Sequence, residues 1–242
     1  MAAGVVLAAV SLDRVVGEPP ARLHPVAWFG RLVGPLDRSW DAPRLVGAVG
    51  AFCLPLLAAV VVALGVGLAG NVEPLAGGVV ATIVLFSAMS LRLLCTTAID
   101  VLEQTETDIA GARASLLALA GRDASDLSAG HIRSAAVESA AENLSDGFVA
   151  PLAGFGVAGV VASRWLTPVA ALAVATAAAA WIKAVNTMDS MVGYRSKPVG
   201  WAAARLDDLV MWLPARLTAL TLSAAARSPD PLVMGRRWAQ TP

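Results

Sequence analysis

The segment Leu45–Ala69, LVGAVGAFCLPLLAAVVVALGVGLA, decides the fold class. It is 25 residues long and carries no charged side chain. A helix of that length, rising about 1.5 Å per residue, is long enough to cross a hydrocarbon core of about 30 Å. The segment is therefore predicted to be a transmembrane helix.

The composition of the whole chain extends this prediction. Hydrophobic residues make up 57% and charged residues 15% of the 242 residues, and the mean hydropathy is +0.68. Soluble domains carry about 25% charged residues. We therefore predict an all-α, polytopic integral membrane protein with about five transmembrane helices. The predicted spans are 1–12, 45–69, 75–91, 149–163 and 166–185, whereas 209–226 is left uncertain because Pro214 and Arg216 lie near its middle.

The charged residues are concentrated in three connections, 13–44, 92–147 and 186–208. Together these hold 12 of the 18 basic and 16 of the 18 acidic residues. If 1–12 crosses the bilayer, alternation of the spans places all three connections on one side. The positive-inside rule makes that side cytoplasmic. We expect a single membrane domain, 1–242, in the cell membrane, with its active face toward the cytoplasm.

Several functional classes are disfavoured by what the sequence contains. The formal net charge is zero and there is no basic tract, so nucleic acid is not an expected partner. Cys53 and Cys95 lie in or beside apolar runs, which argues against a disulfide framework or a zinc site. The common phosphate-binding glycine loops are not found in the sequence either.

The connection 92–147 is predicted to be helical. Ile109–Ala120 has a helical pattern that Gly121 ends, and Asp126 or Ser128 can cap a second helix from about Ala129 to Asn143. On that second helix Ser134, Glu138 and Glu142 share one face. Two glutamates at i, i+4 repel each other, which a magnesium ion or an arginine would offset. A solvated surface helix with a polar carboxyl end is an equally good interpretation.

The connection 186–208 has its polar residues more closely spaced than the connection 92–147. Asn186, Asp189, Ser190 and Gly193 fall on one face at the end of the membrane segment 166–185 and its continuation. Polar groups at such depth are costly and usually functional or paired. Arg195 and Lys197 follow. Arg205 and Asp208, three residues apart on the next predicted helix, suit either a binding site or an ion pair that ties two helices together.

The connection 13–44 begins with an extended segment. Gly17-Glu18-Pro19-Pro20 and Arg22-Leu-His24-Pro25 contain enough proline to disfavour a helix there. His24 can be a hydrogen-bonding structural group or a catalytic group, because it lies beside an arginine and near an acid. Lys183, near the end of 166–185, is expected to extend its ammonium to the membrane surface.

Taken together, these blocks resemble the CobD/CbiB family of cobalamin biosynthesis, the adenosylcobinamide-phosphate synthases. The resemblance covers nearly the whole chain in ordered blocks. They are Gly17-Glu-Pro with Arg22-Leu-His-Pro-Val26 and Gly30-Arg31; Gly121-Arg-Asp123; Ala136-Val-Glu-Ser-Ala-Ala-Glu-Asn-Leu-Ser-Asp-Gly147; Lys183-Ala-Val-Asn-Thr-Met-Asp-Ser-Met-Val-Gly-Tyr-Arg195; and Gly200-Trp-Ala-Ala-Ala-Arg-Leu-Asp-Asp208 with Pro214-Ala-Arg-Leu-Thr218.

The resemblance implies an ATP- and magnesium-dependent ligase. It would join a carboxylate of adenosylcobyric acid to the amine of an amino-alcohol phosphate of the aminopropanol phosphate type, giving adenosylcobinamide phosphate. Catalytic roles are expected for His24, Glu138, Glu142 and Asp189, with His24 as a base for the amine. Substrate or phosphate binding is expected of Arg22, Asn143, Ser145, Asn186, Ser190, Arg195, Lys197 and Arg205. Magnesium ligation is expected of Glu142, Asp146, Asp189, Asp207 and Asp208.

The resemblance also bears on partners and length. Family members usually continue past the last residue of this chain with a Ser-Pro-Asn-Ala-Gly-type block and a final apolar run, so this chain is expected to lack that part. A homo-oligomer or other membrane proteins of the corrinoid pathway are open as partners, besides the bilayer itself. Two other classes remain as alternatives: a polytopic transporter, and a magnesium-dependent lipid phosphotransferase. The spans carry few of the charges that a transporter needs, and Asp207-Asp208 follows Ala204-Arg205, the reverse of the phosphotransferase order.

Overall fold

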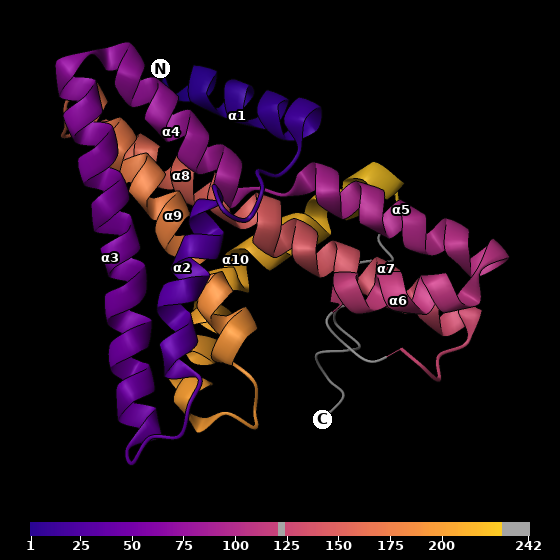
Figure 1. Cartoon of the computed structure of the whole chain (residues 1–242). Helices are drawn as coiled ribbons and strands as arrows, with labels where there is room; N and C mark the ends of the chain where they lie inside the picture. The colour runs from indigo at the N-terminus through magenta and orange to yellow at the C-terminus, as the bar shows by residue number, and fades with distance from the viewer. Residues whose placement is uncertain (121–123, 229–242) are drawn as a thin grey trace. The chain divides into compact units, whose positions relative to one another are not determined.

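The computed structural model describes residues 1–120 and 124–228 (Figure 1). Within these residues the chain forms helices and no strand, so the all-α prediction is confirmed. The α-helices are α1 (Ala2–Val16), α2 (Pro25–Val33), α3 (Pro43–Val72), α4 (Pro74–Ala88), α5 (Leu91–Thr107), α6 (Ile109–Ala120), α7 (Ala129–Leu144), α8 (Ala150–Ala162), α9 (Pro168–Val192) and α10 (Trp201–Ala226). Short segments are η1 (Gly34–Leu36) and η3 (Pro198–Gly200), both 3-10 helices, and η2 (Ser145–Val149), a π-helix.

Five helical stretches of the described residues are long and apolar enough to cross a membrane, judged by length and composition. They are Pro43–Val72, Pro74–Thr107, Ala129–Ala162, Pro168–Val192 and Pro198–Ala226. The predicted multi-pass fold is thereby confirmed. The uncertain segment 209–226 lies inside the last of these stretches. The predicted span 1–12 lies in α1, which is only 15 residues long, and its crossing stays a prediction.

Local sequence signals account for where the helices begin. Proline occupies the first turn of α2, α3, α4, α8 and α9, where its missing N–H costs no hydrogen bond. Ser128 caps α7 by accepting a hydrogen bond from the His131 amide, as one of the two predicted caps. The predicted helix Ile109–Ala120 matches α6, and α7 is one residue longer than predicted. The block Gly121–Asp123 lies outside the described residues.

The chain divides into two compact units, which we describe separately. Unit 1 comprises Met1–Leu91 and Asp146–Met211. In this unit α9 packs along both α3 and α8, and α4 packs against α1, α3 and α9 (Figure 1). Small buried residues of α9, among them Ala171, Ala175 and Ala179, let the helices approach closely.

A second apolar cluster of unit 1 holds the carboxyl end of α9 in place. Phe29 and Val33 of α2 pack with Met188 and Val192 of α9 and with Val199 of η3. Two glycines permit this approach: a Cβ at Gly47 would collide with the backbone oxygen of Val199, and a Cβ at Gly200 with that of Val192. The loop between α9 and α10 is therefore fixed by backbone contacts.

Unit 2 contains Arg92–Ser145 and the part of α10 from Trp212 onward. Helices α5, α6 and α7 share a core that includes Val101, Leu116 and Ile132. Arg133 donates to Thr105 Oγ1 at 2.7 Å, and the Arg113 guanidinium donates to the Leu127 carbonyl at 2.9 Å. The connection 92–147 is helical as predicted, although α5 had not been expected.

Candidate active site

Three residues from separate elements of unit 1 form the centre of the site. The side-chain amide of Asn186 on α9 donates a hydrogen bond to Asp146 Oδ2 at 3.2 Å. Asn186 also hydrogen-bonds the carboxylate of Asp207 on α10. Asp189, one turn farther along α9, and Asp208 act electrostatically on Asp207. Two of the predicted magnesium ligands, Asp146 and Asp207, thus meet at the predicted substrate-binding residue Asn186.

The negative charges of these carboxylates must be offset by a nearby positive charge or by a bound proton. Like charges held close together raise the free energy of the folded protein unless a cation or a proton offsets them. Oδ1 of Asp207 is buried and has no hydrogen-bond partner among the described residues. An oxygen in that state suits a metal-bound water or the metal itself, because Mg²⁺ prefers oxygen ligands.

The residue types at this site are those that can hold a magnesium ion shared with a phosphate. Among the described residues, no group of three or more His, Cys, Asp or Glu side chains lies close enough to enclose a metal ion by itself. Proteins usually hold Mg²⁺ through one or two carboxylates together with substrate phosphates and water. Asp146, Asp189 and Asp207 can supply such ligands. A bound magnesium ion would neutralise charge that develops on phosphate oxygens.

The turn that carries Asp146 has an unusual backbone. Asp146 lies in the π-helical segment η2, and such segments occur frequently at functional sites. The Ser90 amide donates to the Gly147 carbonyl at 3.1 Å, and a Cβ at Gly147 would lie 2.9 Å from Ser90 Oγ. Gly147 therefore lets η2 approach the chain between α4 and α5, which fixes the position of Asp146.

A polar cavity of about 500 Å³ lies at the carboxyl end of α9. Its lining includes the predicted residues Asp189, Arg195, Lys197, Arg205 and Asp208. Arg44, at the start of α3, also lines it, although no local sequence pattern had pointed to this residue. A cavity with several cations beside carboxylates can hold a phosphate and its metal ion.

Two of the predicted cations are already engaged. Lys197 Nζ lies 2.7 Å from Asp37 Oδ2, donates to the Met191 carbonyl at 3.1 Å and lies 5.1 Å from the centre of the Tyr194 ring. Through these contacts Lys197 stabilises the loop between α9 and α10. Arg205 and Asp208 are 3.5 Å apart within α10, with side chains 70% exposed, so this ion pair does not tie two helices together.

Two further candidates of unit 1, Ser190 on α9 and Arg22 before α2, make hydrogen bonds that stabilise the local backbone. Ser190 Oγ donates to the Asn186 carbonyl one turn earlier at 2.8 Å. The Arg22 carbonyl accepts a hydrogen bond from Trp28 Nε1 at 2.9 Å, which fixes the backbone before α2. Binding of substrate by Arg22, Ser190 and Arg195 stays a prediction.

His24 has a structural task that bears on its predicted role as a base. Its Nδ1 accepts a hydrogen bond from the Val26 amide at 3.2 Å and so caps α2. Its Nε2 lies 4.0 Å from Glu18 Oε2. We assign the proton of the neutral ring to Nε2, because Nδ1 must be unprotonated in order to accept. In this tautomer Nε2 can donate to Glu18 but cannot accept a proton.

A pH titration tests whether burial keeps the His24 ring neutral. Burial lowers the pKa of His24 below its usual value, opposed by the Glu18 carboxylate and assisted by Lys183. Because the folded state binds this proton less readily than the unfolded state, the His24 contribution to stability is complete above about pH 6.5 and falls as the pH drops below that value. In a variant with His131 replaced, the NMR signal of His24 should titrate below about pH 6.5, and lower still after Glu18→Gln. A midpoint at or above that of an exposed histidine would show that burial does not favour the neutral form of His24.

The candidates of unit 2 lie on α7 or directly after it. Glu138 and Glu142 share one face of α7, as their spacing predicted, and both side chains are exposed, which agrees with the interpretation of α7 as a solvated surface helix. Asn143 donates to the Ser139 carbonyl at 2.9 Å, and Ser145 Oγ is buried with no hydrogen-bond partner among the described residues. The catalytic, binding and metal-ligating roles of these four residues stay predictions.

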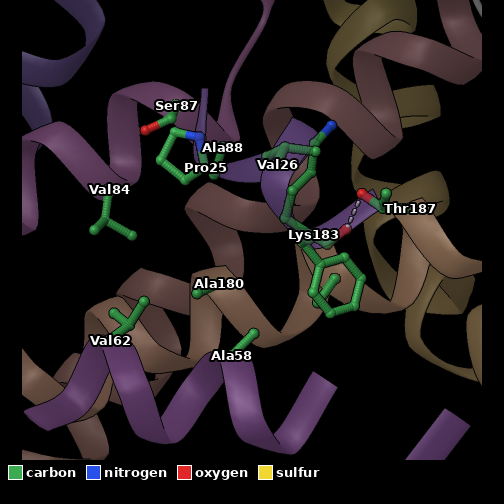
Figure 2. Close-up of a pocket in the computed structure, with 12 residues that line it drawn as sticks. Pro25, Val26, Ala58, Val62, Val84, Ser87, Ala88, Ala180, Lys183 and Thr187 are labelled. Atoms are coloured by element: carbon green, nitrogen blue, oxygen red, sulfur yellow. Dashed lines mark hydrogen bonds between the residues drawn. The ribbon is translucent and has the colours of Figure 1, made fainter. Parts of the chain in front are cut away.

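Sequence reasoning missed the importance of Lys183. Instead of only extending to the surface, its side chain lines a cavity of about 90 Å³ whose other walls come from α2, α3, α4 and α9. Figure 2 shows its ammonium end pointing away from Ala58 and Val62, two of the apolar residues of this cavity. The ammonium interacts electrostatically with Glu18 and Asp146. The available signal was a lysine within an apolar helix, which is usually functional.

The fold and the site define a class: a multi-pass helical membrane protein with a carboxylate-and-cation site in one unit. Comparison with known sequences is more specific. A family model described as CobD/Cbib protein matches residues 6–241. The Probable cobalamin biosynthesis protein CobD of Methanothermobacter thermautotrophicus is 34% identical, covering 97% of this chain and 71% of the relative. The Cobalamin biosynthesis protein CobD of Klebsiella pneumoniae is 38% identical over 89% of this chain and 66% of the relative.

The chain belongs to the CobD/Cbib family, as its sequence blocks predicted. It spans about two thirds of the length of the relatives it matches. No solved structure matches it. Family membership supports a role in cobalamin biosynthesis in a membrane environment.

Proposed function

We propose that this protein ligates an amino-alcohol phosphate to adenosylcobyric acid and so forms adenosylcobinamide phosphate. The reaction consumes ATP, requires magnesium and takes place on the cytoplasmic face of the cell membrane. The observation that carries the proposal is the group Asp146, Asn186 and Asp207 beside a cavity lined by arginines, in a chain of this family. Carboxylates for a metal ion and cations for phosphates are what such a ligation needs.

The chemistry explains the composition of the site. A carboxylate does not react with an amine at neutral pH until its oxygen becomes a better leaving group. Transfer of a phosphoryl group from ATP gives an acyl phosphate, whose carbonyl carbon the amine then attacks. The C–N bond forms as the C–O bond to phosphate breaks, and phosphate leaves. Arg44, Arg195 and Arg205 would bind phosphate oxygens, and the aspartates would hold magnesium.

A reconstituted reaction tests the proposal. Membranes containing the chain, alone or extended by the carboxyl-terminal segment that the resemblance implies, are incubated with adenosylcobyric acid, ATP, magnesium and aminopropanol phosphate. We expect a corrinoid whose mass has increased by the amine minus water, together with one ADP per amide. If neither form of the chain gives this corrinoid with any amino-alcohol phosphate, the proposal fails. Solute uptake by sealed vesicles in the same samples would support the transporter alternative instead.

A further inference from the structure

Glu18 is held in a fixed position at the edge of the site. The chain leaves α1 at Gly17, whose φ of 77° belongs to the left-handed region that glycine adopts readily. Glu18 is then followed by two prolines, which restrict the backbone. Its side chain is 31% exposed. The Glu18 carboxylate is therefore positioned by a short rigid segment and still reaches solvent.

His24 cannot accept a proton in this pair, but Glu18 can. The Nδ1 atom of His24 is occupied by the Val26 amide, and its Nε2 atom carries the proton and faces Glu18. Glu18 Oε2 lies 4.0 Å from Nε2, too far for a direct hydrogen bond, and of these two groups the Glu18 carboxylate is the one that can take up a proton. His24 thus places an N–H group beside the Glu18 carboxylate.

Lys183 connects Glu18 with the carboxylate group. Its ammonium interacts electrostatically with Glu18 on α1's connection to α2 and with Asp146 of η2. Asp146 in turn accepts from Asn186, the residue at the centre of the site. The methylene stem of Lys183 lines the apolar cavity of Figure 2, so the side chain is anchored among packed helices. Pro25 and Val26, which directly follow His24, line the same cavity as Lys183, and Asn186 lies one turn after Lys183 on α9. Glu18, 4.0 Å from His24, therefore lies on the side of unit 1 where we expect phosphate and magnesium.

We propose that the Glu18 carboxylate binds the ammonium group of the amino-alcohol phosphate and takes its proton as the amine attacks. This inference rests on the ligation proposed above. A first proton passes from R–NH3⁺ to Glu18, and the freed nitrogen lone pair forms the C–N bond. The acyl C–O bond breaks to release phosphate, and the departing phosphate takes the second proton from the nitrogen, which leaves the neutral amide. Glu18 then returns its proton to water through its exposed edge. His24 and Lys183 are positioning residues in this step.

Hydroxylamine separates the two halves of the reaction. It is a weaker base than an alkylamine and is largely unprotonated at neutral pH, so it can trap the activated carboxylate as a hydroxamate without a proton acceptor. For Glu18→Gln we expect amide formation to fall by about 100-fold, within the range for loss of a general base. Hydroxamate formation from adenosylcobyric acid and ATP should stay at the wild-type rate.

Two further variants keep this test decisive. Glu18→Asp retains a carboxylate and should recover part of the amide formation, whereas Glu103→Gln, on the exposed side of α5, should behave as wild type. Wild-type amide formation in Glu18→Gln would overturn the inference. So would an equal loss of amide and hydroxamate in Glu18→Gln, since that would place Glu18 in folding or in activation. If the wild-type chain itself forms neither product, the proposed ligation has failed, not the role of Glu18.

Discussion

Replacement of Asp146 by alanine is expected to lower the rate of ligation by about 100-fold or more, the scale seen when a preorganised charge-stabilising group is removed. The Asp146 carboxylate accepts a hydrogen bond from the Asn186 side-chain amide at 3.2 Å and interacts electrostatically with the Lys183 ammonium. Alanine would remove both interactions and one oxygen ligand for magnesium. The initial rate of corrinoid amide formation, normalised to the amount of protein in the membrane, measures the effect.

Two companion variants identify the cause of that loss. Asp146→Asn keeps a side-chain oxygen that can accept the hydrogen bond from Asn186, but it removes the negative charge. If Asp146→Asn is as slow as Asp146→Ala, the loss of the charge, rather than of the hydrogen bond, lowers the rate. Asp41→Ala removes an exposed carboxylate of the same unit and should leave the rate unchanged. A wild-type rate for Asp146→Ala, in protein that unfolds at the wild-type temperature, would show that this group of carboxylates is not the reaction centre.

Replacement of Gly200 by alanine is expected to have the largest effect on stability. The added Cβ would collide with the Val192 carbonyl at the end of α9, so backbone must move rather than a flexible side chain. Overpacking of this kind costs up to about 3 kcal/mol. At about 2–4 °C per kcal/mol, the midpoint of thermal unfolding should fall by roughly 6–12 °C.

Gly65→Ala is the matched control for that measurement. Gly65 lies in α3, and a Cβ there would meet no atom within 4 Å. Alanine favours a helix by up to about 1 kcal/mol over glycine, so this variant should unfold at the same temperature or slightly higher. Equal midpoints for Gly200→Ala and wild type would mean that the loop after α9 is not held by the close backbone contact.

Much of the fold could be predicted because its signals are local. Uncharged runs such as 45–69 have no alternative to a buried or lipid-facing helix, and α6 and α7 carry the pattern and the cap that define a helix. The helix α5 was not predicted, although its buried residues Leu94, Val101 and Thr105 fall at helical spacing, because the threonines and acids of Leu91–Thr107 interrupt its apolar residues. The α5 residues Val101 and Thr105 are buried against α6 and α7 by tertiary contacts, which the local sequence does not reveal.

The site was predictable in its residue types but not in its pairings. Asn186 and Asp146 are 40 residues apart, and Lys197 and Asp37 are 160 apart, so no local spacing reveals that they meet. Spacing alone also left open an ion pair in which Arg205 ties two helices together, whereas Arg205 pairs within α10. The link from Lys183 to Glu18 and Asp146 depends on how α9 packs, which a single sequence does not specify.

The most direct test of the central claim, ligation through an activated carboxylate, follows the oxygen atoms. Adenosylcobyric acid labelled with heavy oxygen in the reacting carboxylate is converted in the presence of ATP, magnesium and aminopropanol phosphate. If the carboxylate is phosphorylated before the amine attacks, one labelled oxygen should appear in the released inorganic phosphate for every amide formed. Amide formation that leaves inorganic phosphate unlabelled would contradict the account.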